Sequence, residues 1–360
     1  MQSALTRAWV EIDLGALRRN GATLAARSGK PLLPMIKADA YGLGAVAAAR
    51  ALEALEPWGF GVATIEEGVT LREAGIERPL VVFTPLARDD LRSARAARLT
   101  PALARAGDIA NWVREGGRAW HLAIDTGMSR AGIRWDLVDT LREAAAAAPP
   151  EGAFTHFHSA ERNDGSVAEQ ERRFDEAIAR LGWRPPLLHV ENSAALARQD
   201  HSRWDLIRPG IFLYGVGSGP GARVRPEPVV QLRARVVDLR TIHDGETVSY
   251  GGSYCAIGER RIATLGLGYA DGYVRSLSNR GVALLRGRRV PIAGVVTMDM
   301  TMLDVTDGEC EIGDVATLIG RSDTAELDLE TVARTADMSP YELLTGLRGR
   351  LAHIYRDSPV

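Results

Sequence analysis

Several polar residues stand where apolar, strand-like runs of the sequence end, and their side chains could do chemistry. The residues are Lys37, Asp125, Arg130, His156, Asn192, Ser193 and Arg208. If the runs are parallel strands of a βα barrel, these ends meet at the face that carries the active site in such barrels. The sequence therefore predicts several titratable groups at one mouth, including an amine that could form a Schiff base with a carbonyl compound.

Taken singly, these residues have ordinary explanations. A lone strand-end lysine is more often solvated than catalytic, His156 could be a hydrogen-bonded structural histidine, and Arg208 could be an ion-pair partner. The run NSAAL could simply place Ser193 at the start of a helix. Their joint placement favours function, because loops after strands seven and eight commonly bind a phosphate, and Ser193 and the backbone around Gly210 could supply donors. A phosphate site facing a lysine is the arrangement expected for pyridoxal phosphate.

Eight apolar runs must position these side chains. They are PLLPMIK, WGFGVAT, PLVVFT, LTPAL, AWHLAIDT, GAFTHF, LLHVEN and LIRPGIFLYG. Between them, segments such as AVAAARALEAL and EQERRFDEAIARL repeat small and apolar residues at helical spacing. Eight strand–helix units ending near residue 215 predict an α/β fold with a TIM-like (β/α)8 barrel, and an open doubly wound sheet is the alternative.

The pattern changes after a stretch rich in glycine and proline, which we interpret as a linker. Beyond it, short strand-like runs separated by turn residues predict a mostly β domain, closed by helices within LDLETVARTADMSPYELLTGL. We therefore expect a cofactor-binding barrel over residues 1–225 and a β-rich domain over residues 226–360. The first strand-like stretch, at about residues 6–14, could pair with either domain, and Asp13 is predicted to cap the helix that follows.

Composition limits the partners. The 360 residues are 46% hydrophobic, and 46 acidic residues nearly balance 44 basic ones, with no basic block that would indicate a nucleic-acid or membrane binder. Cys255 and Cys310 are the only cysteines, and the opening residues lack the apolar core of a signal peptide or a membrane span. We expect a cytoplasmic protein with a small-molecule ligand and no metal.

The segment after Lys37 also allows a nucleotide-binding interpretation. Residues 42–47, GLGAVA, match G-x-G-x-x-A, and Glu66 or Glu67 follows roughly where a ribose-binding acid would stand. Lys37 and Asp39 before the glycines argue against this interpretation, as does the lack of a second nucleotide-binding half.

The segment KADAYGLG, residues 37–44, resembles the pyridoxal-phosphate motif of alanine racemases, K-A-[DN]-A-Y-G-H-G. Further segments resemble motifs of that family in the same order: DTGMSRAG, THFHSAE, HVENSAAL, RPGIFLYG, SYGGSY, GYADGY, TMDM and the late Tyr341. The resemblance covers nearly the whole chain. It implies a βα barrel followed by a β domain, and a pyridoxal-phosphate-dependent homodimer that interconverts L- and D-alanine and supplies D-alanine for peptidoglycan.

The resemblance also implies roles for individual residues. Lys37 would form the Schiff base with the cofactor, and Arg208 would face its pyridine nitrogen. An arginine there donates a hydrogen bond without giving up its proton, which would limit side reactions. The other cofactor-binding residues implied are Tyr41, His156, Asn192, Ser193, Gly210, Ile211 and Tyr341.

Racemisation needs acid–base groups on both faces of the bound amino acid. The resemblance implies Lys37 on one face and, on the other, Tyr250 of the partner subunit, whose phenolate would be favoured through His156 and Arg208. The substrate-binding residues implied are Arg130 and, from the partner subunit, Met298 and Asp299.

Two positions depart from the family pattern. Leu43 replaces a histidine, and Ala123 stands where many members have a carbamylated lysine that orients the arginine matching Arg130. A bound anion, a water cluster or another acid is expected to take over that task. The alternatives to an alanine racemase are a racemase of broader specificity, with serine as a substrate, a fold-related decarboxylase, whose E-P-G-R segment does not occur here, and a non-catalytic single-barrel protein, which would lack the β domain.

Overall fold

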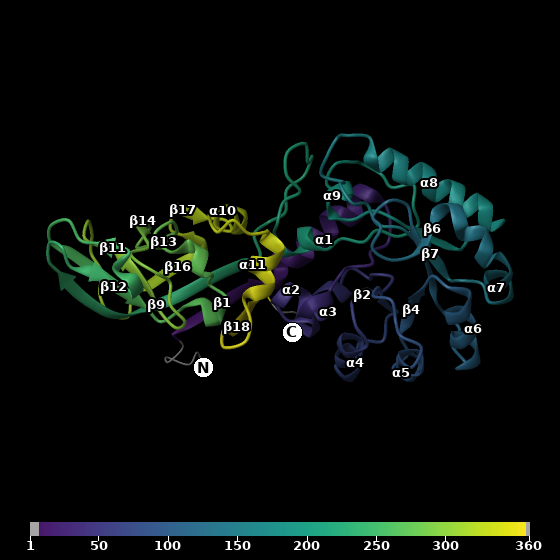
Figure 1. Ribbon diagram of the computed structural model, residues 1–360, viewed down its shortest axis with the longest axis horizontal. Helices are drawn as coiled ribbons and strands as arrows, with labels where there is room; N and C mark the ends of the chain where they lie inside the picture. The colour runs from purple at the N-terminus through teal and green to yellow at the C-terminus, as the bar shows by residue number, and fades with distance from the viewer. Residues whose placement is uncertain (1–6, 358–360) are drawn as a thin grey trace. The chain divides into compact units, whose positions relative to one another are not determined.

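The computed structural model describes residues 7–357, which form two compact units (Figure 1). The unit we term the barrel unit comprises Leu17–Ala40 and Ala45–Glu227. The other, the β unit, comprises the chain up to Ala16, Tyr41–Gly44 and the chain from Pro228 onward. Among the helices described, none is both long and apolar enough to cross a membrane.

Parallel strands line the inside of the barrel unit. They are β2 (Phe60–Val62), β3 (Leu80–Val82), β4 (Thr100–Leu103), β5 (His121–Asp125), β7 (Gly152–Phe154) and β8 (Leu187–His189), paired in that order, with β6 (Ile133–Arg134) beside β5. The pairs are all parallel, as in Phe60 opposite Leu80 and Phe154 opposite His189. Parallel strands need crossover connections, which the intervening helices provide. The predicted α/β fold is confirmed.

Two further segments, residues 31–37 and residues 206–215, complete the parallel barrel. The N–H of Leu33 donates to the carbonyl of Ile207 at 2.8 Å, and the N–H of Ile36 donates to the carbonyl of Gly61 at 2.9 Å. On the other side, the N–H of Leu206 donates to the carbonyl of Leu188 at 3.4 Å. The ring is thereby closed between β8 and β2, as a barrel requires.

These two closing segments differ from the prediction. Residues 31–37 and 206–215 were expected as continuous strands, but each forms only isolated bridges, and Ile211–Tyr214 is a 3-10 helix (η2). Proline explains the interruption, because Pro31, Pro34 and Pro209 have no N–H to donate to a ladder. The prediction of eight regular strands was wrong at these two places.

Helices surround the strands of the barrel unit (Figure 1). They are α1 (Leu14–Ser28, starting in the β unit), α2 (Lys37–Gly42, ending there), α3 (Ala45–Glu53), α4 (Ile65–Glu73), α5 (Asp90–Ala96), α6 (Ala106–Arg114), η1 (Trp135–Leu141), α7 (Arg142–Ala147), α8 (Ser166–Leu181) and α9 (Ser193–Leu196). The predicted Asp13 cap is confirmed, since its Oδ1 accepts a hydrogen bond from the N–H of Ala16 at 2.7 Å.

The β unit is built on a mixed sheet. Its strands are β1 (Ala8–Asp13), β9 (Val230–Ile242), β12 (Arg260–Leu265), β13 (Val282–Leu285), β14 (Arg288–Pro291), β15 (Thr301–Asp304), β16 (Val315–Ser322), β17 (Ala325–Leu327) and β18 (Ala352–Arg356). The first strand lies inside this sheet, antiparallel to β9 and parallel to β18. Strand β18 comes from the far end of the described chain, so the two ends of that chain pair side by side in one sheet.

The rest of the β unit consists of short elements. They are the hairpin β10 (Thr247–Val248) and β11 (Tyr254–Cys255), the 3-10 helices η3 (Tyr250–Gly252), η4 (Tyr269–Asp271) and η5 (Arg275–Leu277), and the helices α10 (Leu329–Thr335) and α11 (Pro340–Gly346). Ser339 caps α11, with Pro340 at its first position. The mostly β second half with a helical segment near its end is confirmed.

Candidate active site

Lys37 opens a left-handed helical turn. Ala38, Asp39, Ala40 and Tyr41 have φ angles of 52°, 53°, 53° and 57°, although none is glycine. Left-handed backbone costs a residue with a Cβ atom about 1–2 kcal/mol. Strain of this kind persists only where surrounding contacts impose it, and it is concentrated at functional sites.

Glu67 of α4 supplies one of those contacts. Its Oε1 accepts from the N–H of Ala38 at 2.7 Å, and its Oε2 accepts from the N–H of Ala63 at 2.7 Å. Asp39 supplies another, because its Oδ1 accepts from the N–H of Ala45 at the start of α3, also at 2.7 Å. The lysine segment is therefore tied to the end of β2 and to α3.

These contacts assign Glu67 a different task from the ribose binding considered above. Other residues of the chain fill the space next to the two glycines of that interpretation. A Cβ on Gly44 would lie 2.0 Å from the hydroxyl oxygen of Tyr355, and one on Gly42 would lie 3.0 Å from the carbonyl oxygen of Leu344. The glycines serve close packing inside the β unit, so the nucleotide-binding interpretation is not supported.

The Lys37 amine lies in a positively charged surrounding. Burial, followed by the positive charge of Arg130, lowers the pKa of Lys37; the charge of Arg208 adds to this, while Glu67 opposes it. A lowered pKa increases the fraction of neutral amine, the form that attacks a carbonyl carbon or accepts a proton. The lowered pKa is compatible with the reactive lysine predicted from the sequence, and that role stays a prediction.

Arg208 is buried, with 3% of its surface exposed, and is held by the ends of two strands. Its Nη2 donates to the carbonyl of Thr155 at 2.6 Å and lies 3.3 Å from Nδ1 of His156. Its Nη1 lies 2.8 Å from Nδ1 of His189. Burial lowers the pKa of Arg208 to about 9, so the guanidinium remains charged at neutral pH. The predicted neighbourhood of Arg208 and His156 is present.

Two histidines that the sequence interpretation missed extend this network. Nε2 of His189 lies 2.8 Å from Nδ1 of His121, and both rings are fully buried. Burial and the charge of Arg208 lower the pKa of His189 well below its ordinary value, and that of His121 to about 3. Since an arginine only donates, neutral His189 accepts at Nδ1 and donates from Nε2 to His121. His189 ends β8, close to the polar residues that follow it, which was an available signal, whereas His121 begins β5 and had none.

Residues predicted from the sequence to bind a phosphate, Ser193 and Gly210, lie next to each other. The Oγ of Ser193 accepts from the N–H of Gly210 at 2.8 Å and from that of Phe212 at 3.3 Å. The Oδ1 of Asn192 accepts from the N–H groups of Ala194 and Ala195 at 3.2 Å each, which makes Asn192 the N-cap of α9. Ile211 opens η2 directly after Gly210. The helix-cap interpretation of NSAAL is confirmed, and phosphate binding by the same segment stays a prediction.

Arg130 is exposed, and its positive charge helps to lower the pKa values of both Lys37 and His156. Burial is the main cause of the lowered pKa of His156, which is about 3. Ala123, the position at which the family pattern is broken, packs with Ala102, Phe154 and other apolar side chains. The expectation that a bound anion, a water cluster or another acid takes over the task of the missing lysine stays a prediction.

The remaining predicted residues lie in the β unit. The ring centroid of Tyr41 is 6.1 Å from that of Tyr341, and burial raises the pKa of Tyr41 above its ordinary value. Tyr250 is 76% exposed and lines a surface pocket of about 630 Å³. The other residues lining it are Tyr269, Val274, Arg275, Val295, Val296 and Thr297. Met298 is 53% exposed, and Asp299 accepts a hydrogen bond from Arg350 at 2.7 Å.

Comparison with known proteins places this arrangement in a family. The sequence model of the family's N-terminal domain, 'Alanine racemase, N-terminal domain', matches residues 12–218. The sequence model of its C-terminal domain, 'Alanine racemase, C-terminal domain', matches residues 229–355. The chain is 38% identical to an alanine racemase of Sorangium cellulosum, covering 96% of this chain and 98% of that one. It is also 38% identical to an alanine racemase of Symbiobacterium thermophilum, covering 96% of each.

Solved structures agree. The alanine racemase of E. faecalis superimposes with a TM-score of 0.92 at 28% identity, covering 98% of each chain. The alanine racemase of Bartonella henselae, with covalently bound pyridoxal phosphate, superimposes with a TM-score of 0.90 at 29% identity, covering 98% of this chain and 100% of that one. The sequence matches and the superpositions both extend over almost the entire chain. This protein therefore belongs to the alanine racemase family, and it is an enzyme.

Proposed function

We propose that this protein interconverts L- and D-alanine as a cytoplasmic homodimer with pyridoxal phosphate attached to Lys37, and that it supplies D-alanine for peptidoglycan. The observation that carries the proposal is the surrounding of Lys37: a half-buried amine with a lowered pKa, close to Arg130 and Arg208. Family membership supports the reaction, and the covalently bound cofactor of the Bartonella henselae enzyme supports the cofactor.

The donor groups of the barrel unit fit this cofactor. Lys37 provides the amine for its aldehyde carbon, and the backbone N–H groups that now donate to Ser193 could donate to its phosphate. The Nε–H of Arg208 makes no hydrogen bond within residues 7–357, whereas its Nη1 and Nη2 atoms are fully engaged. We assign that Nε–H to the pyridine nitrogen, and Asn192, Gly210, Ile211, Tyr41 and Tyr341 to the surroundings of the phosphate. When bound, the cofactor acidifies the Cα–H bond of an amino acid joined to it.

Separate side chains transfer the proton on each face of the substrate and bind its carboxylate. Lys37 moves a proton to or from Cα on one face, because its lowered pKa leaves more of the amine neutral near pH 7. Tyr250 of the partner subunit does so on the opposite face, which agrees with its exposure on the β unit. Arg130, with the backbone around Met298 and Asp299 of the partner subunit, holds the substrate carboxylate.

Arg208 serves fidelity in this scheme. It stays charged, and the carbonyls of Thr155 and Val190 fix its position, so it donates a hydrogen bond without transferring a proton to the ring. Neutral His156 accepts from Arg208 at Nδ1, which leaves Nε2 as the ring's donor toward the phenol.

The experiment that tests this function uses purified protein loaded with pyridoxal phosphate and incubated separately with L-alanine, L-serine and L-lysine. Chiral chromatography should show L-alanine converting to an equal mixture of both enantiomers, with serine slower and lysine unchanged. Release of carbon dioxide without formation of a D-amino acid would identify a decarboxylase. Serine or lysine converting as fast as alanine would overturn the assigned specificity.

A further inference from the structure

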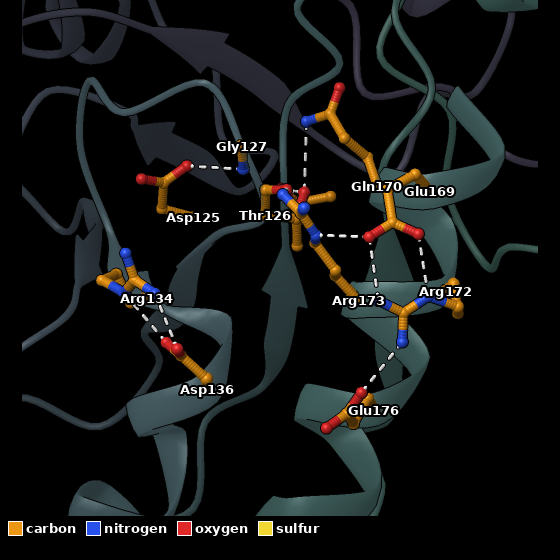
Figure 2. Close-up of polar contacts among 11 residues, drawn as sticks. Asp125, Thr126, Gly127, Arg134, Asp136, Glu169, Gln170, Arg172, Arg173 and Glu176 are labelled. Atoms are coloured by element: carbon orange, nitrogen blue, oxygen red, sulfur yellow. Dashed lines mark hydrogen bonds and ion pairs between the residues drawn. The ribbon is translucent and has the colours of Figure 1, made fainter. Parts of the chain in front are cut away.

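Helix α8 of the barrel unit contacts the loop after β5 (Figure 2) and the loop after β7, and both loops carry predicted site residues. Gln170 of this helix is 1% exposed and every N–H of its amide is used. Its Nε2 donates to Oγ1 of Thr126 at 3.2 Å and to the carbonyl of His156 at 3.0 Å, and its Oε1 accepts from the N–H of His158 at 3.1 Å. One amide therefore joins the loop after β5 to the loop after β7.

A second link lies beside it. The hydroxyl oxygens of Thr126 and Thr155 are 2.8 Å apart, and both threonines are buried. Thr155 also accepts from Arg208 through its carbonyl. Buried polar networks that are fully satisfied favour one arrangement strongly, because each unpaired member would be costly. The two loops are thus held to each other as well as to α8.

Arg173, one turn further along α8, holds the first loop from the outside. Its Nη1 donates to the carbonyl of Thr126 at 3.0 Å, while its Nε donates to Glu169 at 2.8 Å (Figure 2). Within the same loop, Oδ1 of Asp125 accepts from the N–H groups of Gly127 and Ser129 at 3.0 Å each. Arg130 follows directly, so the backbone leading to it is fixed from two sides.

We propose that Gln170 and Arg173 are positioning residues, which hold the loops that place Arg130 and His156 for the reaction. The inference rests on the proposed function, from which it takes the roles of those two residues. It also gives a way to hold Arg130 where position 123 is an alanine, because α8 fixes the backbone of the loop that leads to Arg130. A displacement of about 1 Å at such a group is enough to slow a reaction severely.

Arg172 provides a matched control for Arg173. Both arginines bind Glu169, and their guanidinium carbons lie 5.8 and 5.7 Å from the ring centroid of Trp135. Only Arg173 reaches Thr126, whereas Arg172 turns to Glu176. Comparison of Arg173→Met with Arg172→Met therefore isolates the hydrogen bond to the loop.

We expect Arg173→Met to raise the KM for alanine about fivefold with kcat changed less than about twofold, since one hydrogen bond is lost and the carboxylate-binding arginine is displaced. Arg172→Met should stay close to wild type. Arg173→Lys should restore most of the KM, because an ammonium can still donate to the carbonyl of Thr126. Equal KM values in the two methionine variants would overturn the proposed role.

Hydrogen exchange of the cofactor-loaded protein gives a readout besides activity. The amides of residues 126–130 should exchange faster in Arg173→Met than in Arg172→Met. Gln170→Glu, which cannot donate to the carbonyl of His156 at neutral pH, should accelerate exchange in both loops and lower kcat/KM about tenfold or more. Unchanged exchange in Arg173→Met and Gln170→Glu overturns the inference whatever the activity, whereas a wild-type protein that does not racemise alanine overturns the proposed function instead.

Discussion

The Oε1 atom of Glu67 accepts a hydrogen bond from the N–H of Ala38 at 2.7 Å, directly after the lysine of the site. Its second oxygen binds the N–H of Ala63, at the end of β2. The carboxylate thus bridges Ala38 and Ala63, which are 25 residues apart in the sequence. It stabilises the left-handed turn that begins at Ala38, which the local sequence alone would disfavour.

Replacement of Glu67 by glutamine should therefore weaken the lysine segment. The amide offers one acceptor oxygen for two N–H groups, so one of them loses its partner, at a cost of about 1–3 kcal/mol in the free energy of unfolding. We expect a lower melting temperature and a clear loss of kcat/KM. Glu66→Gln is the matched control, because Glu66 is fully exposed. Equal losses in the two variants would show that the bridge is unimportant.

Lys37→Ala should give a folded protein without covalently attached cofactor. The test is unusually clean because Lys30 is the only other lysine in the sequence. Borohydride reduction followed by mass spectrometry should show the cofactor on wild type and on Lys30→Ala, and not on Lys37→Ala. A reduced adduct on Lys37→Ala would show that another amine carries the cofactor.

The proposed shared site predicts complementation between two inactive variants. Lys37→Ala and Tyr250→Ala homodimers should each be nearly inactive, and subunit exchange should restore activity. A hybrid two-fold dimer has one site with both defects and one with neither. Random exchange makes about half of the dimers hybrid, so about a quarter of all sites should be intact. Differently tagged chains verify the exchange, and exchange without recovered racemisation would exclude the shared site.

Glu191 predicts a pH dependence of stability. Its side chain is 1% exposed, with Gln199 and Ser202 as donors to its carboxylate, and burial raises the pKa of Glu191 to about 7. Because this pKa exceeds the unfolded value of about 4.3, the folded protein binds more protons between these pH values. The stability contributed by Glu191 is therefore complete below about pH 4 and is lost as the pH rises through 7.

The variant Glu191→Gln cannot titrate and should lose this dependence. Relative to wild type, its free energy of unfolding should rise with pH between 5 and 7 by at most about 1.4 kcal/mol per pH unit. The buried histidines contribute in the opposite direction, since their pKa values are lowered, but they are common to both proteins and cancel in the difference. Chemical denaturation at several pH values measures it, and parallel curves would contradict the prediction.

Much of the fold and of the candidate site could be predicted from the sequence. The strand–helix alternation indicated parallel strands, because each buried strand has to be followed by a covering crossover. Ser193 and Gly210 could be paired in advance, since they follow neighbouring strands of one barrel. The alternation of strand-like and helix-like segments and the short motifs are local properties of the chain, and a sequence displays local patterns directly.

Other features were decided only by the tertiary structure. Nothing local in KADAY predicts a left-handed turn of four residues with side chains, because its stabilising partners Glu67 and Ala45 act from other elements. The prolines that shorten the closing strands were visible, but the bridges that still close the ring were not. The hydrogen bond between His121 and His189, the contact of His189 with Arg208, and the hydrogen bonds of Gln170 to two loops all join distant segments. The geometry of these contacts depends on how the strands and helices of the barrel pack, because packing brings together residues that are far apart in the sequence.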